Sequence, residues 1–133
     1  MSNYSMKKKV DLDYEDAIEK VKAELKKEGF GVLSEIDMKQ TFKDKIGEDF
    51  NKYIILGACN PKFAYKVLQM EEDIGLLLPC NVIVSTSDSG DTIVAVINPM
   101  AVMNLSNNEE IKKLAKEIKE RLERVIKNMY MKM

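Results

Sequence analysis

The chain has 133 residues with 21 basic and 22 acidic side chains, so its formal net charge is −1. A balance this close to neutral argues against a partner held mainly by charge, such as a nucleic acid or an anionic membrane. Histidine is absent, which excludes Ser-His-Asp and Cys-His catalysis and most zinc sites, because each of these needs an imidazole.

The first predicted elements are a strand over residues 4–10 and a helix that follows it. The lysine run at 7–9 is typical of an edge strand rather than of a nucleic-acid patch, because lysines commonly guard exposed strand edges. Asp13 predicts the N-cap of the helix. The spacing of the apolar residues after it indicates an amphipathic helix that Gly29 ends in a left-handed conformation.

The next part of the chain predicts two strands with a short polar helix between them. In residues 32–37, apolar and polar side chains alternate closely enough to predict a strand. Asp37 and Gly47 are suited to cap a short helix over 38–46. Residues 52–58 are mostly apolar on both faces, which is typical of an interior strand.

Asn60 and Pro61 predict the start of another helix, because Asn is a favoured N-cap and Pro suits the first helical position. Residues 74–86 then predict a long strand, which Pro79 interrupts by removing a backbone donor. A polar turn leads into a returning strand over 91–97, and the two strands make a hairpin.

The last predicted element is a long amphipathic helix. Asn107 or Asn108 is its N-cap, and an apolar stripe along one face runs to Met129. The order is therefore β-α-β(4)-α, an α+β fold with a mainly antiparallel sheet, two long helices on one face and short inserted helices. The other sheet face then needs a cover, which the short helices or a second subunit could supply.

Length and hydropathy predict a single domain over residues 1–133. The longest apolar runs are far shorter than the ~20 residues of a membrane-spanning helix, and the first residues lack the apolar core of a secretory signal. With two cysteines and no such signal, we expect a cytoplasmic protein with reduced thiols and no membrane partner.

Two cysteines in matching contexts are the most suggestive residues for chemistry. Cys59 precedes the predicted helix start, where the positive end of the helix dipole would lower the pKa of its thiol. If the segment around Cys80 lies beside it, the two thiols would share a pocket. The candidate binding and thiol site is therefore Gly57, Cys59, Asn60, Pro61, Pro79, Cys80 and Asn81.

Several interpretations of this pair stay open. The thiols are buried packing residues, which is the commonest fate of free cysteine, or they line a ligand or redox site, or they hold a soft metal. Their separation matches neither a zinc nor a CxxC pattern, so we predict no metal site and assign no cofactor. Gly57, Asn60 and Pro61 lack a phosphate-loop pattern, although a capped helix start can expose N–H groups to an anion.

Three motifs resemble those of domain-of-unknown-function family 302. They are LGACNP at 56–61, IGLLLPCNV at 74–82 and KEGFGVL at 27–33. The resemblance covers almost the whole chain and implies the same β-α-β(4)-α order and a homodimer. Lys62 and Asn98 depart from the family pattern, which often has a second proline and an aspartate there. No established activity is implied, and a fold does not fix a function.

We therefore expect a homodimeric module that binds a small ligand near Cys59, Asn60, Cys80 and Asn81. A thiol-dependent redox enzyme or sensor that uses Cys59 and Cys80 is the first alternative. The second alternative is a structural or interaction protein in which both cysteines serve packing. The sequence leaves open whether the chain is an enzyme and assigns no catalytic residue.

Overall fold

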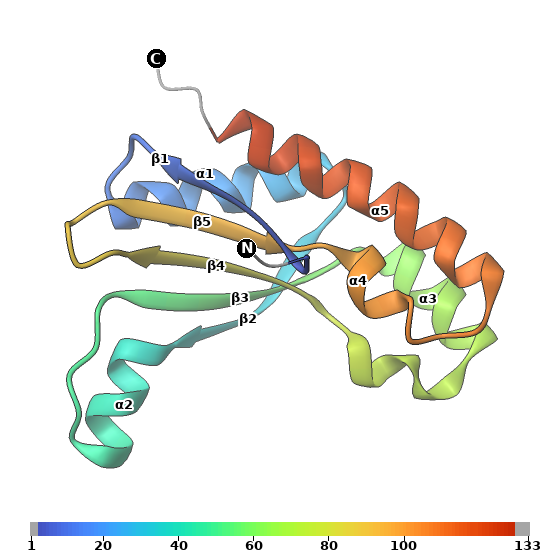
Figure 1. The fold of residues 1–133 in the computed structure, drawn as a ribbon, viewed down its shortest axis with the longest axis horizontal. Coiled ribbons are helices and arrows are strands. Elements are labelled where there is room, and N and C mark those ends of the chain that lie inside the picture. Colours follow the sequence, from blue (N-terminus) through green and yellow to red (C-terminus); the bar gives the residue numbers. More distant parts are fainter. Residues whose placement is uncertain (1–2, 130–133) are drawn as a thin grey trace.

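The computed structural model describes residues 3–129, and within them five strands form one antiparallel sheet (Figure 1). The strands are β1 (Ser5–Val10), β2 (Gly31–Asp37), β3 (Tyr53–Cys59), β4 (Cys80–Thr86) and β5 (Thr92–Ile97). Their spatial order is β1-β5-β4-β3-β2. β1 is thus an edge strand, as its lysines predict, and β3 is an interior strand. The predicted α+β class is confirmed.

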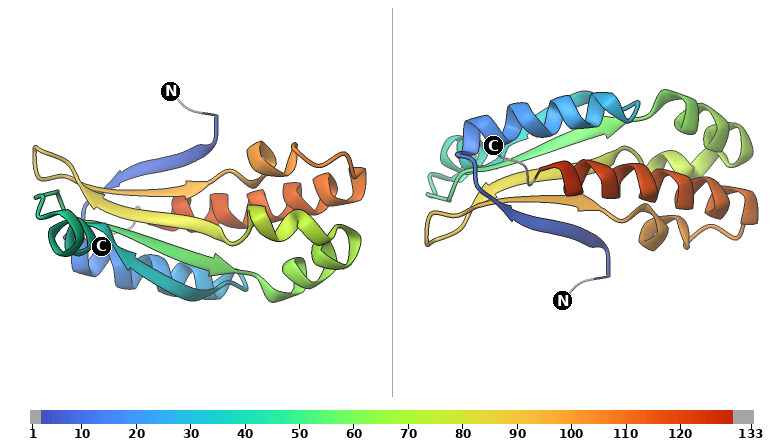
Figure 2. Two further views of the ribbon diagram at one scale, coloured as in Figure 1. Left: turned by 90° about the horizontal axis from the view of Figure 1, so that it is seen from below. Right: turned by 90° about the horizontal axis from the view of Figure 1, so that it is seen from above.

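Two long helices, α1 (Tyr14–Lys27) and α5 (Glu109–Asn128), lie over one face of the sheet (Figure 2, right). The shorter helical elements are α2 (Met38–Ile46), α3 (Pro61–Met70), α4 (Pro99–Met103) and the 3-10 segment η1 (Glu72–Leu77). Among residues 3–129, no helix is long and apolar enough to cross a membrane.

The helix boundaries follow the predicted capping chemistry. The Oδ1 atom of Asp13 accepts a hydrogen bond of 2.9 Å from the backbone N–H of Asp16 at the start of α1. Gly29 follows the end of this helix with a φ of 88°, a value that glycine adopts without strain. At α5 the cap is Asn108, whose Oδ1 accepts from the N–H of Glu110 at 2.8 Å.

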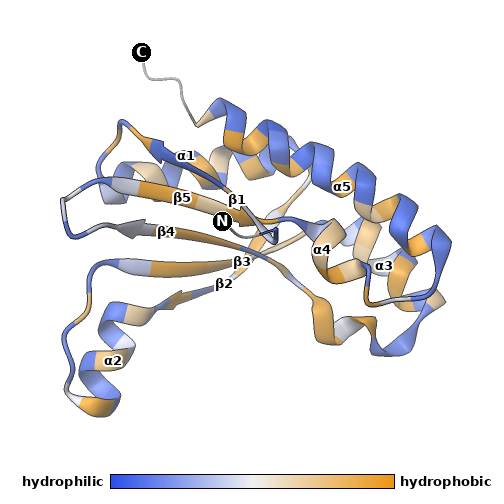
Figure 3. Cartoon of the chain, in the orientation of Figure 1, coloured by the Kyte–Doolittle hydropathy of each residue, from blue (hydrophilic) through white to orange (hydrophobic). Residues whose placement is uncertain are grey.

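The main core lies between the sheet and the layer formed by α1 and α5. Alternate residues of the three central strands point into it. They are Ile54, Leu56, Ala58, Cys80, Val82, Val84, Val94 and Val96. The helices contribute a stripe of apolar side chains that recurs as bands along α5 in Figure 3. Burying each Val, Leu or Ile side chain of this set contributes about 1.5–3 kcal/mol, so this covered face is the main source of stability.

The other face of the sheet is open at its centre. It carries the intervening residues of the same strands, among them Ile55, Ile83 and Ala95, which lie beside one another in the register. Seen from this side (Figure 2, left), no helix lies in front of the middle of the strands, and α2, α3 and α4 lie toward the ends of the sheet. The short helices therefore leave this face uncovered within residues 3–129.

The predicted strand over residues 74–86 is wrong in its first part. Glu72–Leu77 is a 3-10 segment, and β4 begins only at Cys80. Ile74 is buried while Leu76 is 86% exposed, and a short apolar run does not distinguish such a buried turn from a strand. Pro79 precedes the strand instead of interrupting it, so its missing N–H removes no bond from the ladder.

Candidate functional site

The corner between β3 and α3 positions the first group of candidate residues. β3 ends at Cys59, and Asn60 caps α3 by accepting a hydrogen bond of 3.2 Å from the N–H of Phe63 at its Oδ1 atom. Pro61 occupies the first helical position, where its missing N–H costs nothing because that group has no helical partner. The predicted cap is confirmed, and it fixes the direction in which the chain leaves the sheet.

Cys59 and Cys80 lie at one cavity. β3 and β4 are neighbours, and Ala58 is the register partner of Cys80. Both cysteines are free thiols, Cys80 buried and Cys59 partly buried. They line the same cavity of about 430 Å³, which we call the thiol pocket. Within residues 3–129, no group of three or more His, Cys, Asp or Glu side chains is placed to hold a metal ion.

The lining of the thiol pocket is mostly apolar. Its further residues come from β2, β3, the corner, α3 and the segment before β4. They are Leu33, Ser34, Ala58, Asn60, Phe63, Ala64, Leu68, Gly75, Leu78 and Pro79. Beside the two thiols, Ser34 and Asn60 are the lining side chains with polar atoms. An apolar cavity with few polar groups is the usual form of a small-molecule site, where the polar groups orient the ligand.

Burial works against thiolate formation in this pocket. Desolvation raises the pKa of the Cys59 thiol. Desolvation, and then the negative charge of Cys59, raise the pKa of Cys80 to about 11. The prediction of a lowered pKa for Cys59 is therefore wrong, because burial disfavours the charged thiolate and raises the pKa. At neutral pH both residues are protonated thiols.

Two of the predicted site residues lie at other cavities. Asn81 lies on the open sheet face, at a shallow cavity of about 270 Å³ that Ile55 and Ile83 also line. It is separated from the Cys80 side chain because successive residues of a strand point to opposite faces. Pro61 lines a cavity beside the α3 start. The predicted residues thus divide among three neighbouring surfaces.

Gly57 allows β2 and the segment before β4 to pack closely against β3. A Cβ atom at this position would collide with the side chain of Ser34 and lie 3.1 Å from Cγ of Pro79. Ser34 and Pro79 both line the thiol pocket. The glycine therefore shapes the pocket by letting two of its walls come together.

A second cavity adjoins the thiol pocket, and the sequence analysis missed it. It has a volume of about 290 Å³ and shares Asn60 and Phe63 with the thiol pocket. Its other lining residues come from the end of α1, from α3 and from α5. They are Gly29, Pro61, Lys62, Lys66, Leu114, Glu117, Ile118 and Arg121. We call it the basic cavity. Lys62 and Lys66, one turn apart on α3, are a feature of the sequence that could have indicated a basic site. The sequence does not show that α5 packs beside them.

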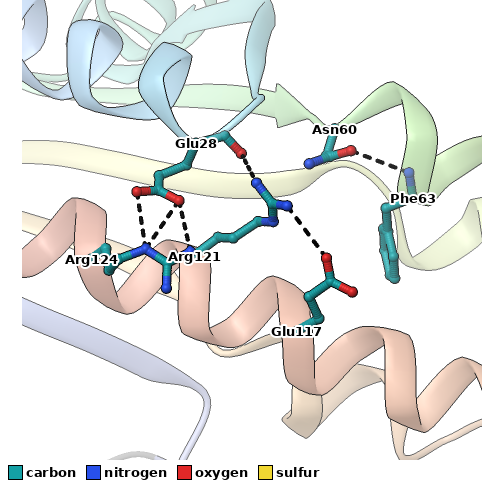
Figure 4. Close-up of polar contacts among 6 residues, drawn as sticks. All are labelled: Glu28, Asn60, Phe63, Glu117, Arg121 and Arg124. Carbon is teal, nitrogen blue, oxygen red and sulfur yellow. Dashed lines mark hydrogen bonds and ion pairs between the residues drawn. The ribbon is translucent and has the colours of Figure 1, made fainter.

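Arg121 ties α5 to the end of α1 at the edge of the basic cavity (Figure 4). Its Nη1 donates to the carbonyl oxygen of Glu28 at 3.0 Å, and its Nη2 donates to Oε2 of Glu117 at 3.4 Å. One turn further on, Arg124 binds the carboxylate of Glu28 through Nε and Nη2 at 2.9–3.1 Å. These contacts hold the wall that α5 contributes.

Comparisons with known proteins give a family and similar solved structures. The family described as "Domain of unknown function DUF302" matches residues 6–129. A crystal structure of an uncharacterized conserved DUF302 protein from Bacillus stearothermophilus is similar, with a TM-score of 0.89 and 26% identity. The likeness covers 96% of this chain and 99% of that chain. No curated protein matches.

Proposed function

For this chain, which belongs to the DUF302 family of domains of unknown function, we propose a role as a homodimeric module that binds a small ligand in a mostly apolar pocket. The observation that carries the proposal is the thiol pocket, a cavity of about 430 Å³ with a mostly apolar lining. Both its size and its lining lie in the range of small-molecule sites, which have volumes of about 300–1,000 Å³.

The lining residues contribute two kinds of contact to a ligand. Phe63, Leu68 and Leu78 supply apolar surface, while Ser34 and Asn60 supply polar atoms that orient the ligand. Cys59 and Cys80 act as soft apolar contacts, because a protonated thiol behaves as a small hydrophobe. The raised pKa of both thiols keeps them in this protonated form.

Ligand binding is tested with a neutral naphthylamine dye whose fluorescence rises in apolar surroundings. We expect saturable binding of one dye per chain. Ala64→Trp fills the pocket from α3 and should abolish the binding, since Ala64 is a lining residue. The matched control is Tyr65→Trp, because the next residue along α3 is 68% exposed. Dye binding that Ala64→Trp leaves unchanged, in a variant with unchanged circular dichroism, would contradict the proposal.

The homodimer part of the proposal rests on the open sheet face. Five strands form the sheet, and with strands about 4.8 Å apart and about six residues of 3.3 Å each, the face measures roughly 24 by 20 Å. Two copies face to face would bury about 1,000 Å² of such surface, which is close to the minimum for a specific interface. Flat apolar sheets pack on one another in this way, so a second copy of the chain is the occupant we propose.

A charge at the centre of the open face tests the dimer. Ile83 lies on the middle strand of the sheet, between Ile55 of β3 and Ala95 of β5. We expect the wild-type chain to sediment as a dimer and Ile83→Asp to sediment as a monomer. Leu76→Asp is the control, because Leu76 is exposed on η1 away from this face, and it should remain a dimer. A wild-type chain that is monomeric at micromolar concentration would refute this part.

One observation favours a second function, thiol redox chemistry, because Cys59 and Cys80 line the same cavity. Their raised pKa values place this function second, since the thiolate is the reactive form. Mild oxidation with diamide distinguishes the two functions. A fast intramolecular disulfide, seen as the loss of two alkylatable thiols, would favour redox chemistry, and two persistent thiols would favour binding or packing.

A further inference from the structure

We propose that the ligand is an anionic amphiphile, whose apolar chain fills the thiol pocket and whose negative head group lies in the basic cavity. This inference rests on the proposed function, since it requires that the thiol pocket takes a ligand. It adds the chemical class of that ligand. Three features support it: the two cavities share lining residues, positive charges surround the second cavity, and hydrogen-bond donors face it.

The two cavities are neighbours that share two lining residues, Asn60 and Phe63. Phe63 is 6% exposed and presents carbon surface to the thiol pocket. Figure 4 shows the side-chain oxygen of Asn60 on the side of Phe63 and its amide nitrogen on the side of Arg121. A ligand that extends past these two residues from one cavity to the other would meet apolar surface at one end and a hydrogen-bond donor at the other.

The side chains around the basic cavity carry an excess of positive charge. Lys62 and Lys66 of α3 and Arg121 of α5 line it, against the one lining carboxylate of Glu117. That carboxylate is already paired with Arg121 at 3.4 Å. Lys62 and Lys66 have no ion-pair partner among residues 3–129, so both ammonium groups are available to an anion. Charge-assisted hydrogen bonds of this type are among the stronger polar contacts.

The space for a head group is the basic cavity itself, of about 290 Å³, and Gly29 at the end of α1 lines it without adding a side chain. A Cβ atom on Gly29 would lie 3.2 Å from Nδ2 of Asn60 and 3.8 Å from Nη1 of Arg121. Two nitrogen donors thus border the position that this glycine leaves without a side chain. The Oδ1 atom of Asn60 is used by the N–H of Phe63, which leaves the amide nitrogen as the group that faces a ligand.

The test compares three ten-carbon ligands, decanoate, decyl phosphate and decanol, as competitors of the neutral dye below their micelle concentrations. We expect both anions to bind about tenfold more tightly than decanol, because two charged contacts are gained. This advantage should shrink as the salt concentration rises. The tighter of the two anions identifies the preferred head group, carboxylate or phosphate.

The double variant Lys62→Gln/Lys66→Gln should remove the advantage of the anions and leave the affinity for decanol unchanged. Its control is Lys113→Gln/Lys116→Gln, which removes the same charge from exposed positions of α5 that do not line the cavity. Equal affinities for decanoate, decyl phosphate and decanol in the wild-type chain would overturn the head-group inference alone. Equal effects of the two double variants would also overturn it. Failure of the dye to bind would instead refute the proposed function.

Discussion

Leu56 and Ile55 are consecutive residues of β3 that face opposite sides of the sheet. Leu56 is fully buried on the face that α1 and α5 cover, whereas Ile55 is partly exposed on the open face. Both faces of the central strands are apolar, so the hydropathy of the strands alone does not distinguish them. The difference comes from the two amphipathic helices, whose apolar stripes cover one face only. The covered face stabilises the chain, and the open face remains available for association.

The largest expected effect comes from truncating the two neighbours separately. Leu56→Ala should cost about 2–5 kcal/mol of unfolding free energy, because it leaves a cavity in the covered core. Ile55→Ala should cost about 1 kcal/mol, because its side chain already contacts water. Urea unfolding of both variants in the Ile83→Asp background keeps the comparison free of dimerisation. Equal losses would show that the open face is as important to the folded chain as the covered one.

The two cysteines should differ in their rate of alkylation, and the cysteine on the covered face should react more slowly. Cys80 points to the covered face and its pKa is about 11, so iodoacetamide at pH 8 should modify Cys59 first. The rate at Cys80 should keep rising as the pH approaches 11, since only the thiolate reacts. Peptide mass spectrometry measures both rates, and in denaturant they should become equal. A faster reaction at Cys80 in the folded chain would contradict this.

A smaller effect is expected at Glu24, a carboxylate inside the covered layer that is 2% exposed. Burial alone would raise its pKa, but hydrogen bonds of 2.9 and 3.0 Å from Lys20 and Lys27 outweigh it, so the pKa lies below the ordinary 4.5. The ionised group therefore contributes stability above pH 4.5 that is lost as the pH falls through its folded-state pKa.

Glu24→Gln checks this sign. The variant should be less stable than the wild type at pH 7, and its stability should fall less steeply below pH 4.5. Thermal unfolding between pH 3 and 7 measures both quantities. If the stability of the wild type and of the variant fell equally steeply below pH 4.5, the pKa of Glu24 would be the same in the folded and the unfolded chain.

The part of the structure that the sequence could predict is the part that local chemistry decides. Asp13, Asn60 and Asn108 act as caps because their side chains reach N–H groups two or three residues away. The run at 74–79 failed as a strand because its apolar residues pack as a turn, and only tertiary contacts distinguish the two.

Of the two cavities at the candidate site, only the thiol pocket could be predicted from the sequence. Cys59 and Cys80 come together because β3 and β4 are sequential neighbours, a common arrangement. Asn81 was assigned to the same pocket, but the alternation of a strand sends it to the open face. The basic cavity was missed because Arg121 comes from α5, and the packing of α5 near α3 depends on the whole fold.

The pairing of β1 with β5 has a consequence for how the chain is made. The first strand synthesised finds its partner only when Ile97, opposite Ser5, has been translated. Closing so long a loop is slow compared with forming the local β4–β5 hairpin. We therefore expect β1 to stay unpaired on the ribosome until β5 has been made, and we expect Lys7, Lys8 and Lys9 to discourage its aggregation during that time. Pulse-labelled hydrogen exchange should find the amides of β1 among the last to gain protection.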